Sequence, residues 1–143
     1  MDWAEFNCAL KKSIRLNKAF AIVDSCPELR GADWGCGWCW VLAESIRRVL
    51  GKRASLVMIV NYRGKVQHVL TAHKDLPDML IDGDGIETWR KKIETSILEG
   101  VKGPVLAAFD FSMAKGSAGY DETCVRKLTA FFRRRLGPRR RLS

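Results

Sequence analysis

Residues 35–43 read Gly35-Cys36-Gly37-Trp38-Cys39-Trp40-Val41-Leu42-Ala43. From Cys39 to Gly51, apolar residues recur at the spacing of one helix face, namely Leu42, Ala43, Ile46, Val49 and Leu50. The pattern predicts a helix that begins at Cys39, after two glycines that permit a close approach of the backbone. Because the free N–H groups and positive dipole end of a helix N-terminus lower the pKa of a thiol, Cys39 is a candidate nucleophile.

The composition of the 143-residue chain favours one domain, since 47% hydrophobic residues can build one sizeable core. Its five cysteines, at positions 8, 26, 36, 39 and 124, are an odd number, which argues against a disulfide framework. The N-terminal segment carries several lysines, and the longest aliphatic run is residues 56–60, so we expect neither a signal peptide nor a membrane span. We expect an intracellular, reducing, cytoplasmic setting, with delivery into a host cell as an open alternative.

The formal net charge of +9 is concentrated near the C-terminus. Six of the 25 basic residues lie within residues 133–141, and without them 19 basic residues face 16 acidic ones, a balance of +3. These six are Arg133, Arg134, Arg135, Arg139, Arg140 and Arg141. Such a segment can bind nucleic acid or an acidic partner. We favour the alternative that the first three complement the dipole at the end of a last helix, which Gly137-Pro138 terminates.

The remaining pattern alternates helices and strands. Helices are expected over residues 2–16, 39–50 and 86–100 and from Asp121 onward, and residues 24–37 form a loop. Strands are expected over residues 54–62, 65–72, 79–82 and 104–111, with Arg63-Gly64 as a hairpin turn. This order predicts the α+β fold class.

Two of the expected strands carry polar residues suited to acid–base chemistry. His68 lies in the middle of a strand among valines and leucines, where a histidine is otherwise a core residue, and His73 is expected in an exposed loop. Asp82 ends a strand, whereas Asp84 lies between glycines, as in a turn. We therefore favour His68 and Asp82 as partners of the Cys39 thiol.

A family resemblance joins these residues. The segment Gly37-Trp38-Cys39-Trp40-Val41-Leu42-Ala43 looks like the nucleophile segment of transglutaminase-like proteins, and Cys36-Gly37-Trp38-Cys39-Trp40 is similar to that of papain-like cysteine proteases. His68 and Asp82 follow in the matching catalytic order, so the resemblance covers residues 33–89. It implies a minimal papain-like or transglutaminase-like domain over residues 1–136, with an N-terminal helix and loop in residues 1–33 and a basic tail in residues 137–143.

The resemblance also implies an activity without cofactors. Cys39 would attack an amide carbonyl of a protein or peptide, His68 would transfer the proton, and Asp82 would orient the imidazole. A peptidase or isopeptidase is favoured, with glutamine deamidation or transglutaminase-type acyl transfer as alternatives. Small chains of this build occur as viral proteases and as bacterial or phage effectors.

The oxyanion-binding residues depart from the papain-like pattern. Papain-like enzymes carry a glutamine a few residues before the cysteine, where this chain has Asp33 and Trp34. The backbone N–H of Cys39 is one candidate donor, and the indole N–H of Trp34 or Trp38 is a candidate second donor. Asp33, Trp34 and Trp38 are also the residues expected to line the substrate cleft.

Two competing hypotheses use other residues. Cys36, Cys39, His68 and His73 have the ligand types of a zinc site, but 28 residues with their own helix and strand separate the pairs. We therefore expect no metal, and Cys36 is expected to support packing or the loop. The second hypothesis is a non-catalytic binding module whose arginine-rich tail contacts nucleic acid or an acidic partner.

Overall fold

The computed structural model describes residues 1–26, 29, 37–115 and 119–136 of the chain. The helices are α1 (Trp3–Ile14), α2 (Asn17–Asp24), α3 (Cys39–Leu50), α4 (Trp89–Leu98), α5 (Phe111–Lys115) and α6 (Glu122–Leu136). The strands are β1 (Ala54–Val60), β2 (Val66–His73), β3 (Met79–Asp82), β4 (Gly85–Thr88) and β5 (Val105–Ala108). The predicted α+β class is confirmed.

The five strands form one antiparallel sheet in the order β4-β3-β2-β1-β5. The predicted hairpin is confirmed by the antiparallel pairing of β1 and β2. In its turn, Gly64 adopts a positive φ of 76°, as such turns need. The side chain of Asn61 accepts hydrogen bonds from the backbone N–H groups of Arg63 and Lys65 and closes the turn.

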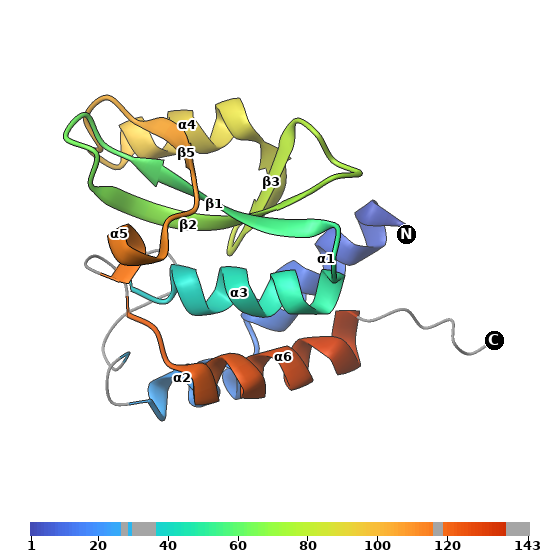
Figure 1. The fold of residues 1–143 in the computed structure, drawn as a ribbon. Coiled ribbons are helices and arrows are strands. Elements are labelled where there is room, and N and C mark those ends of the chain that lie inside the picture. The colour runs from blue at the N-terminus through green and yellow to red at the C-terminus, as the bar shows by residue number, and fades with distance from the viewer. Residues whose placement is uncertain (27–28, 30–36, 116–118, 137–143) are drawn as a thin grey trace.

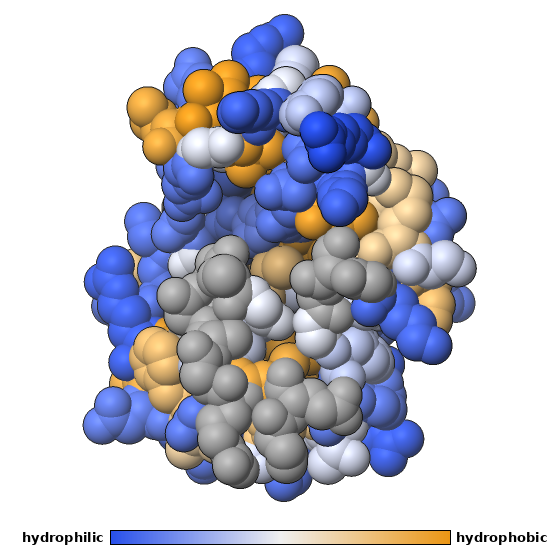
Figure 2. All heavy atoms as spheres, turned by 90° about the vertical axis from the view of Figure 1, so that its left-hand side faces the viewer, coloured by the Kyte–Doolittle hydropathy of each residue, from blue (hydrophilic) through white to orange (hydrophobic). Residues whose placement is uncertain are grey.

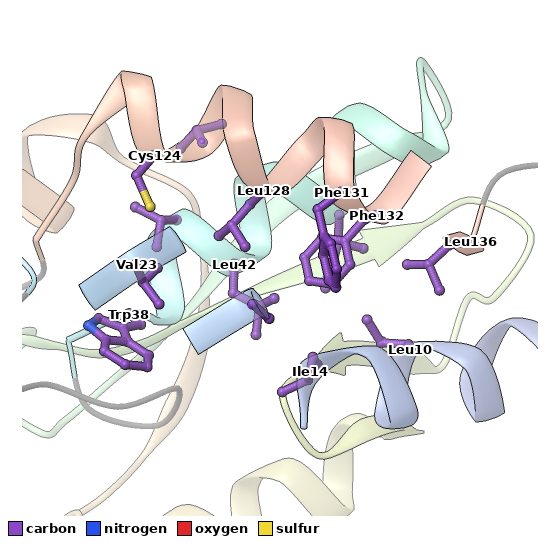
Figure 3. Packing of buried hydrophobic residues seen from close by; sticks show 14 of the residues in the cluster. Leu10, Ile14, Val23, Trp38, Leu42, Cys124, Leu128, Phe131, Phe132 and Leu136 are labelled. Atoms are coloured by element: carbon purple, nitrogen blue, oxygen red, sulfur yellow. The ribbon is translucent and has the colours of Figure 1, made fainter. Parts of the chain in front are cut away.

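Helices cover both faces of the sheet (Figure 1). Helix α4 lies on one face. Helix α3 lies on the other face, between the sheet and α6, while α1 contacts both the edge strand β4 and α6. The first two turns of α3 are therefore buried on all sides, from Cys39 to Ile46. Leu42 packs with Leu128 and Phe132 of α6 and with Leu10 of α1, which Figure 3 shows gathered in one cluster.

A β-bulge in β2 lies beside His68. Ile59 pairs with His68, but the next residue of β1, Val60, pairs with Val66, so that Gln67 is left out of register. The extra residue lets Val66 and Val69 pack together under α3, although regular alternation would place them on opposite faces. Bulges increase the local twist of a strand and redirect its side chains, and this one lies next to His68.

Helix α6 begins as predicted, because the Asp121 carboxylate accepts a hydrogen bond of 2.9 Å from the backbone N–H of Cys124. Helix α4 begins three residues later than predicted. Residues 85–88 pair with β3 as β4, and the hydroxyl of Thr88 accepts a hydrogen bond from the N–H of Lys91 at the first turn. None of the helices in the described part of the chain is long and apolar enough to cross a membrane.

His73 is not the exposed loop residue that the sequence predicted. It is the last residue of β2, is buried, and pairs with Ala54 of β1. The ring of Trp3 packs edge-on against its imidazole at 4.8 Å, and its Nδ1 atom accepts a hydrogen bond from the N–H of Asp75. His73 is therefore buried because Trp3 of α1 packs against it.

Candidate active site

Cys39 is the first residue of α3, as the sequence predicted. Gly37, with a φ of 107°, precedes it, and Trp38 occupies the N-cap position without giving a side-chain cap to the helix. The backbone N–H groups of Trp40, in the first turn of the helix, and of Val69, on β2, interact with the Cys39 thiol, and Cys39 is only 5% exposed. A buried thiol at an uncapped helix start is surrounded by partial positive charge.

His68 and Asp82 meet on two interior strands of the sheet. They lie on adjacent antiparallel strands, β2 and β3, whose register is set by the pair of Thr71 and Ile81. The Nε2 atom of His68 lies 2.9 Å from Oδ2 of Asp82. The two residues therefore form the hydrogen-bonded pair that the sequence predicted, although 14 positions separate them in the chain.

The other ring nitrogen of His68 faces the thiol. Its Nδ1 atom is buried and has no hydrogen-bond partner within the described residues. The Cys39 side chain is the group that interacts with the imidazole besides Asp82. The three side chains are thus arranged in series, from the sulfur through the imidazole to the carboxylate.

The electrostatics of the pair favour a thiolate and an imidazolium. Burial acts to raise the pKa of Cys39, but the interaction with His68 and the backbone N–H groups of Val69 and Trp40 outweigh it and lower the pKa. Burial likewise acts to lower the pKa of His68, but the hydrogen bond with Asp82 and the interaction with Cys39 raise it to about 10. The lowered pKa of the thiol and the raised pKa of the imidazole both favour transfer of the proton from the sulfur of Cys39 to the ring of His68.

Asp82 is fixed from its other side by Lys92, a residue that the sequence analysis missed. The Nζ atom of Lys92 donates to Oδ1 of Asp82 at 2.6 Å, and the backbone N–H of Asp84 donates to the same oxygen at 2.9 Å. Burial acts to raise the pKa of Asp82, but His68 and Lys92 together lower it. The sequence signal for a buried lysine was that Lys92 lies on the same helix face as Trp89 and Ser96.

A cleft of about 420 Å³ opens onto His68 and Asp82. The described residues that line it come from α1 and its C-cap, from α2 and β2, and from the end of β3 and the turn after it. They are Lys11, Ile14, Arg15, Phe20, His68, Asp82, Gly83 and Asp84. Its size suits a side chain or a short segment of an extended ligand. Figure 2 shows the face of the molecule at which α3 begins, where hydrophilic side chains gather below an apolar area near α4 and β5.

The candidate oxyanion donors differ in what the structure describes of them. The indole N–H of Trp38 donates to the backbone carbonyl of Leu29, so this donor is already engaged within the fold. Asp33, Trp34 and Cys36 lie outside the described residues. The backbone N–H at the start of α3 is the candidate donor whose position the structure describes.

Two of the arginines of α6 form hydrogen bonds within the fold. Arg135 donates to the Ser13 hydroxyl at 2.7 Å, and Arg133 donates to the backbone carbonyl of Arg48. Arg133, Arg134 and Arg135 form the last turn of α6, where positive charge complements the helix dipole. Arg139, Arg140 and Arg141 lie outside the described residues.

No three histidine, cysteine or acidic side chains among the described residues are arranged to hold a metal ion. Of the four residues of the zinc hypothesis, Cys36 lies outside that part of the chain, and His73 is directed into a contact with Trp3. No family model, curated protein or solved structure matches this chain. The functional argument therefore depends on the geometry of the site.

Proposed function

We propose that this protein is a cysteine hydrolase of the papain-like and transglutaminase-like kind, acting on amide bonds of a protein or peptide as a peptidase or isopeptidase. One observation carries the proposal: the partly buried imidazole of His68 lies between the thiol of Cys39 and the carboxylate of Asp82. A histidine that has an acid on one nitrogen and a thiol facing the other has the arrangement of an activated nucleophile and its base. The adjoining cleft supplies room for a substrate.

The first half of the proposed reaction forms a thioester. The Cys39 thiolate attacks the carbonyl carbon of the amide, and the carbonyl oxygen becomes an oxyanion near the N-terminus of α3. The His68 imidazolium then gives its proton to the amide nitrogen, the C–N bond breaks, and the amine leaves. His68 is neutral at this point, and the acyl group is bound to the sulfur.

The second half regenerates the pair. Neutral His68 takes a proton from water, whose oxygen attacks the thioester carbon, and the C–S bond breaks to release the acid and the thiolate. The imidazolium is restored beside Asp82, whose negative charge stabilises it in both halves. An amine in place of water would give a new amide by the same proton transfers.

Selective alkylation tests the thiol. With iodoacetamide at pH 7, we expect Cys39 to be modified roughly tenfold faster than Cys8, because a lowered pKa raises the thiolate fraction. Cys8 is exposed and serves as a control within the same chain, whereas Cys39 is buried. The variant His68→Ala should lose the excess rate. A rate at Cys39 no greater than that at Cys8, measured by peptide mass spectrometry, would refute the proposal.

Product analysis tests the reaction. A denatured mixed-protein substrate incubated with the wild type should yield new termini, and Cys39→Ala should yield none. Adding glycine ethyl ester as an acceptor separates the outcomes, since transfer places the ester on the acyl product and hydrolysis leaves a free carboxylate. Ammonia release without a new terminus would indicate deamidation in place of peptide-bond cleavage.

A further inference from the structure

Lys92 occupies a position that a lysine seldom takes. It lies in the first turns of α4, on the side that packs against the sheet, and its side chain is 3% exposed. Its Nζ atom has three acceptors, Oδ1 of Asp82 at 2.6 Å, the carbonyl of Gly85 at 3.0 Å and Oε1 of Glu87 at 3.0 Å. An ammonium group has three protons to donate, so each is used within the described structure.

These contacts divide the two oxygens of Asp82 between different partners. Oδ1 receives the ammonium of Lys92 and the backbone N–H of Asp84, and Oδ2 is left for Nε2 of His68. Rotating the carboxylate would break both bonds to Oδ1, and a short bond to an ammonium is among the stronger hydrogen bonds in proteins. The orientation of Asp82 is therefore determined from α4, on the side away from His68.

The thiol pair depends on that orientation. His68 presents Nδ1 to Cys39 only while its Nε2 is held by Oδ2 of Asp82. We propose that Lys92 is a positioning residue, which holds the Asp82 carboxylate so that His68 faces the Cys39 thiol in a productive orientation. The inference deepens the proposed function and rests on it.

The groups that could affect the same titration come from several elements. Cys39 lies on α3, His68 on β2, Asp82 and Asp84 at the end of β3, and Glu87 on β4. Glu99 faces the same small cavity as Lys92 from the end of α4. Lys11 of α1 and Arg15, which follows α1, line the cleft. Because many charges act here, the test must isolate the effect that passes through Asp82.

A double-mutant cycle makes that separation. The rate of Cys39 alkylation by iodoacetamide is measured as a function of pH, and the midpoint pH of its rise from acid is determined. The proteins compared are the wild type, Lys92→Met, Asp82→Asn and the double variant. In the wild-type background, Lys92→Met should raise the midpoint and lower the rate at pH 6 roughly tenfold, the change that one pKa unit produces. In the Asp82→Asn background the same substitution should change the rate by less than about twofold, because its route is already broken.

The exposed neighbour Lys91 provides a matched control, since Lys91→Met removes the same charge one position away on α4. It should leave the midpoint unchanged. Lys92→Gln keeps an N–H donor and should give a smaller shift than Lys92→Met. Circular dichroism establishes that each variant is folded, and Lys92→Gln takes the place of Lys92→Met in the cycle if the latter is unfolded.

Equal shifts in the two backgrounds would overturn the inference, since Lys92 would then act as a distant charge or as a support of the fold. No shift in the wild-type background would overturn it as well. In both cases Cys39 would still react faster than Cys8, and the proposed function would stand. An ordinary rate at Cys39 in the wild type would instead reject the proposed function, and the positioning role with it.

Discussion

The Nε2 atom of His68 lies 2.9 Å from Oδ2 of Asp82, and this contact decides which ring nitrogen is left for the proposed reaction. Nε2 carries the proton that it donates to the carboxylate, so in the proposed mechanism Nδ1 is the atom that exchanges a proton with Cys39. Turning the ring over would place a carbon against Asp82 and leave a buried carboxylate oxygen without its partner. The roles of the two nitrogens are thus fixed by the sheet.

The pH dependence of Cys39 alkylation should follow the pair. The pKa of Cys39 is lowered and the pKa of His68 is raised to about 10, so the thiolate–imidazolium form spans the range between them. The alkylation rate should rise at a pH below the ordinary cysteine value and change again near pH 10 as the imidazolium loses its proton. Amide hydrolysis needs that proton and should decline there. A single rise centred near the ordinary cysteine pKa of about 8.5 would contradict the ion pair.

Replacing Asp82 tests the assignment of the acid. Asp82→Asn removes the charge that stabilises the imidazolium, so the pKa of His68 should fall and the thiolate fraction at pH 6 with it. The variant also leaves the buried ammonium of Lys92 without its closest partner, and loss of one member of a buried pair costs about 3–5 kcal/mol. Thermal unfolding and the alkylation rate at pH 6 measure the two effects.

Asp84→Asn is the matched comparison, since Asp84 lies two residues away and was the alternative acid in the sequence. Its backbone N–H binds Asp82, and the substitution leaves that N–H in place. A larger loss of thiol reactivity in Asp84→Asn than in Asp82→Asn would reverse the assignment.

The contribution of Asp82 to stability also depends on pH. Because its folded-state pKa is lowered, that contribution is present above the unfolded value of about 3.9 and is lost as the pH falls through the folded value. The stability difference between the wild type and Asp82→Asn should therefore shrink in acid. A difference that grows below pH 4, measured by urea denaturation, would contradict the lowered pKa.

The parts of the fold that the sequence predicted are those with local signals. The glycines and apolar spacing around Cys39 mark the start of α3, and the glycines after Asp82 mark the end of β3. Helix α2 was missed because it is short and its N-cap, Leu16, gives no side-chain hydrogen bond. Tertiary packing of Ala19 and Val23 stabilises it instead.

The site was predictable only for residues whose chemistry is unusual in its local context. A histidine among valines is conspicuous, and so is a carboxylate at a strand end. Lys92 is not, because a lysine in a helix is normally solvated. Its role follows from β4, a four-residue strand that places Gly85 and Glu87 beside it and that the pattern of residues 86–100 concealed.

The cations of the cleft should favour anionic reagents. Lys11 and Arg15 line the cleft beside His68 and form no ion pair with another described residue. We expect Lys11→Gln and Arg15→Gln each to lower the ratio of Cys39 alkylation rates by iodoacetate and iodoacetamide about two- to fivefold at low salt, as expected for about 1 kcal/mol between charges near water.

Lys12→Gln provides the control for that ratio, because Lys12 is an exposed residue of α1 that does not line the cleft. The ratio should stay unchanged in this variant. In the wild type it should fall as salt is added, since screening weakens the attraction between exposed charges. A ratio equally sensitive to all three substitutions would indicate a general effect of net charge.

The turn at Gly85 should tolerate substitution less well than the turn at Gly64. Gly85 has a φ of 102°, and a Cβ atom there would lie 2.5 Å from Oδ1 of Asn7. That oxygen cannot withdraw freely, because it accepts a hydrogen bond of 2.8 Å from the N–H of Ile86. Gly64 has a φ of 76°, and nothing lies within 4 Å of its Cβ position. Gly64→Ala should therefore cost about 1–2 kcal/mol from the backbone conformation alone.

Gly85→Ala should cost about 2–4 kcal/mol, since backbone strain of about 1–3 kcal/mol is joined by the loss of the hydrogen bond from Ile86 to Asn7. It should also slow Cys39 alkylation at pH 6, because the carbonyl of Gly85 is an acceptor for Lys92, and movement of that turn disturbs the anchor of Asp82. Urea denaturation and the alkylation rate measure the two effects. Equal stability losses in the two variants, with unchanged alkylation in both, would show that the contact with Asn7 places no constraint on the turn that carries Asp82.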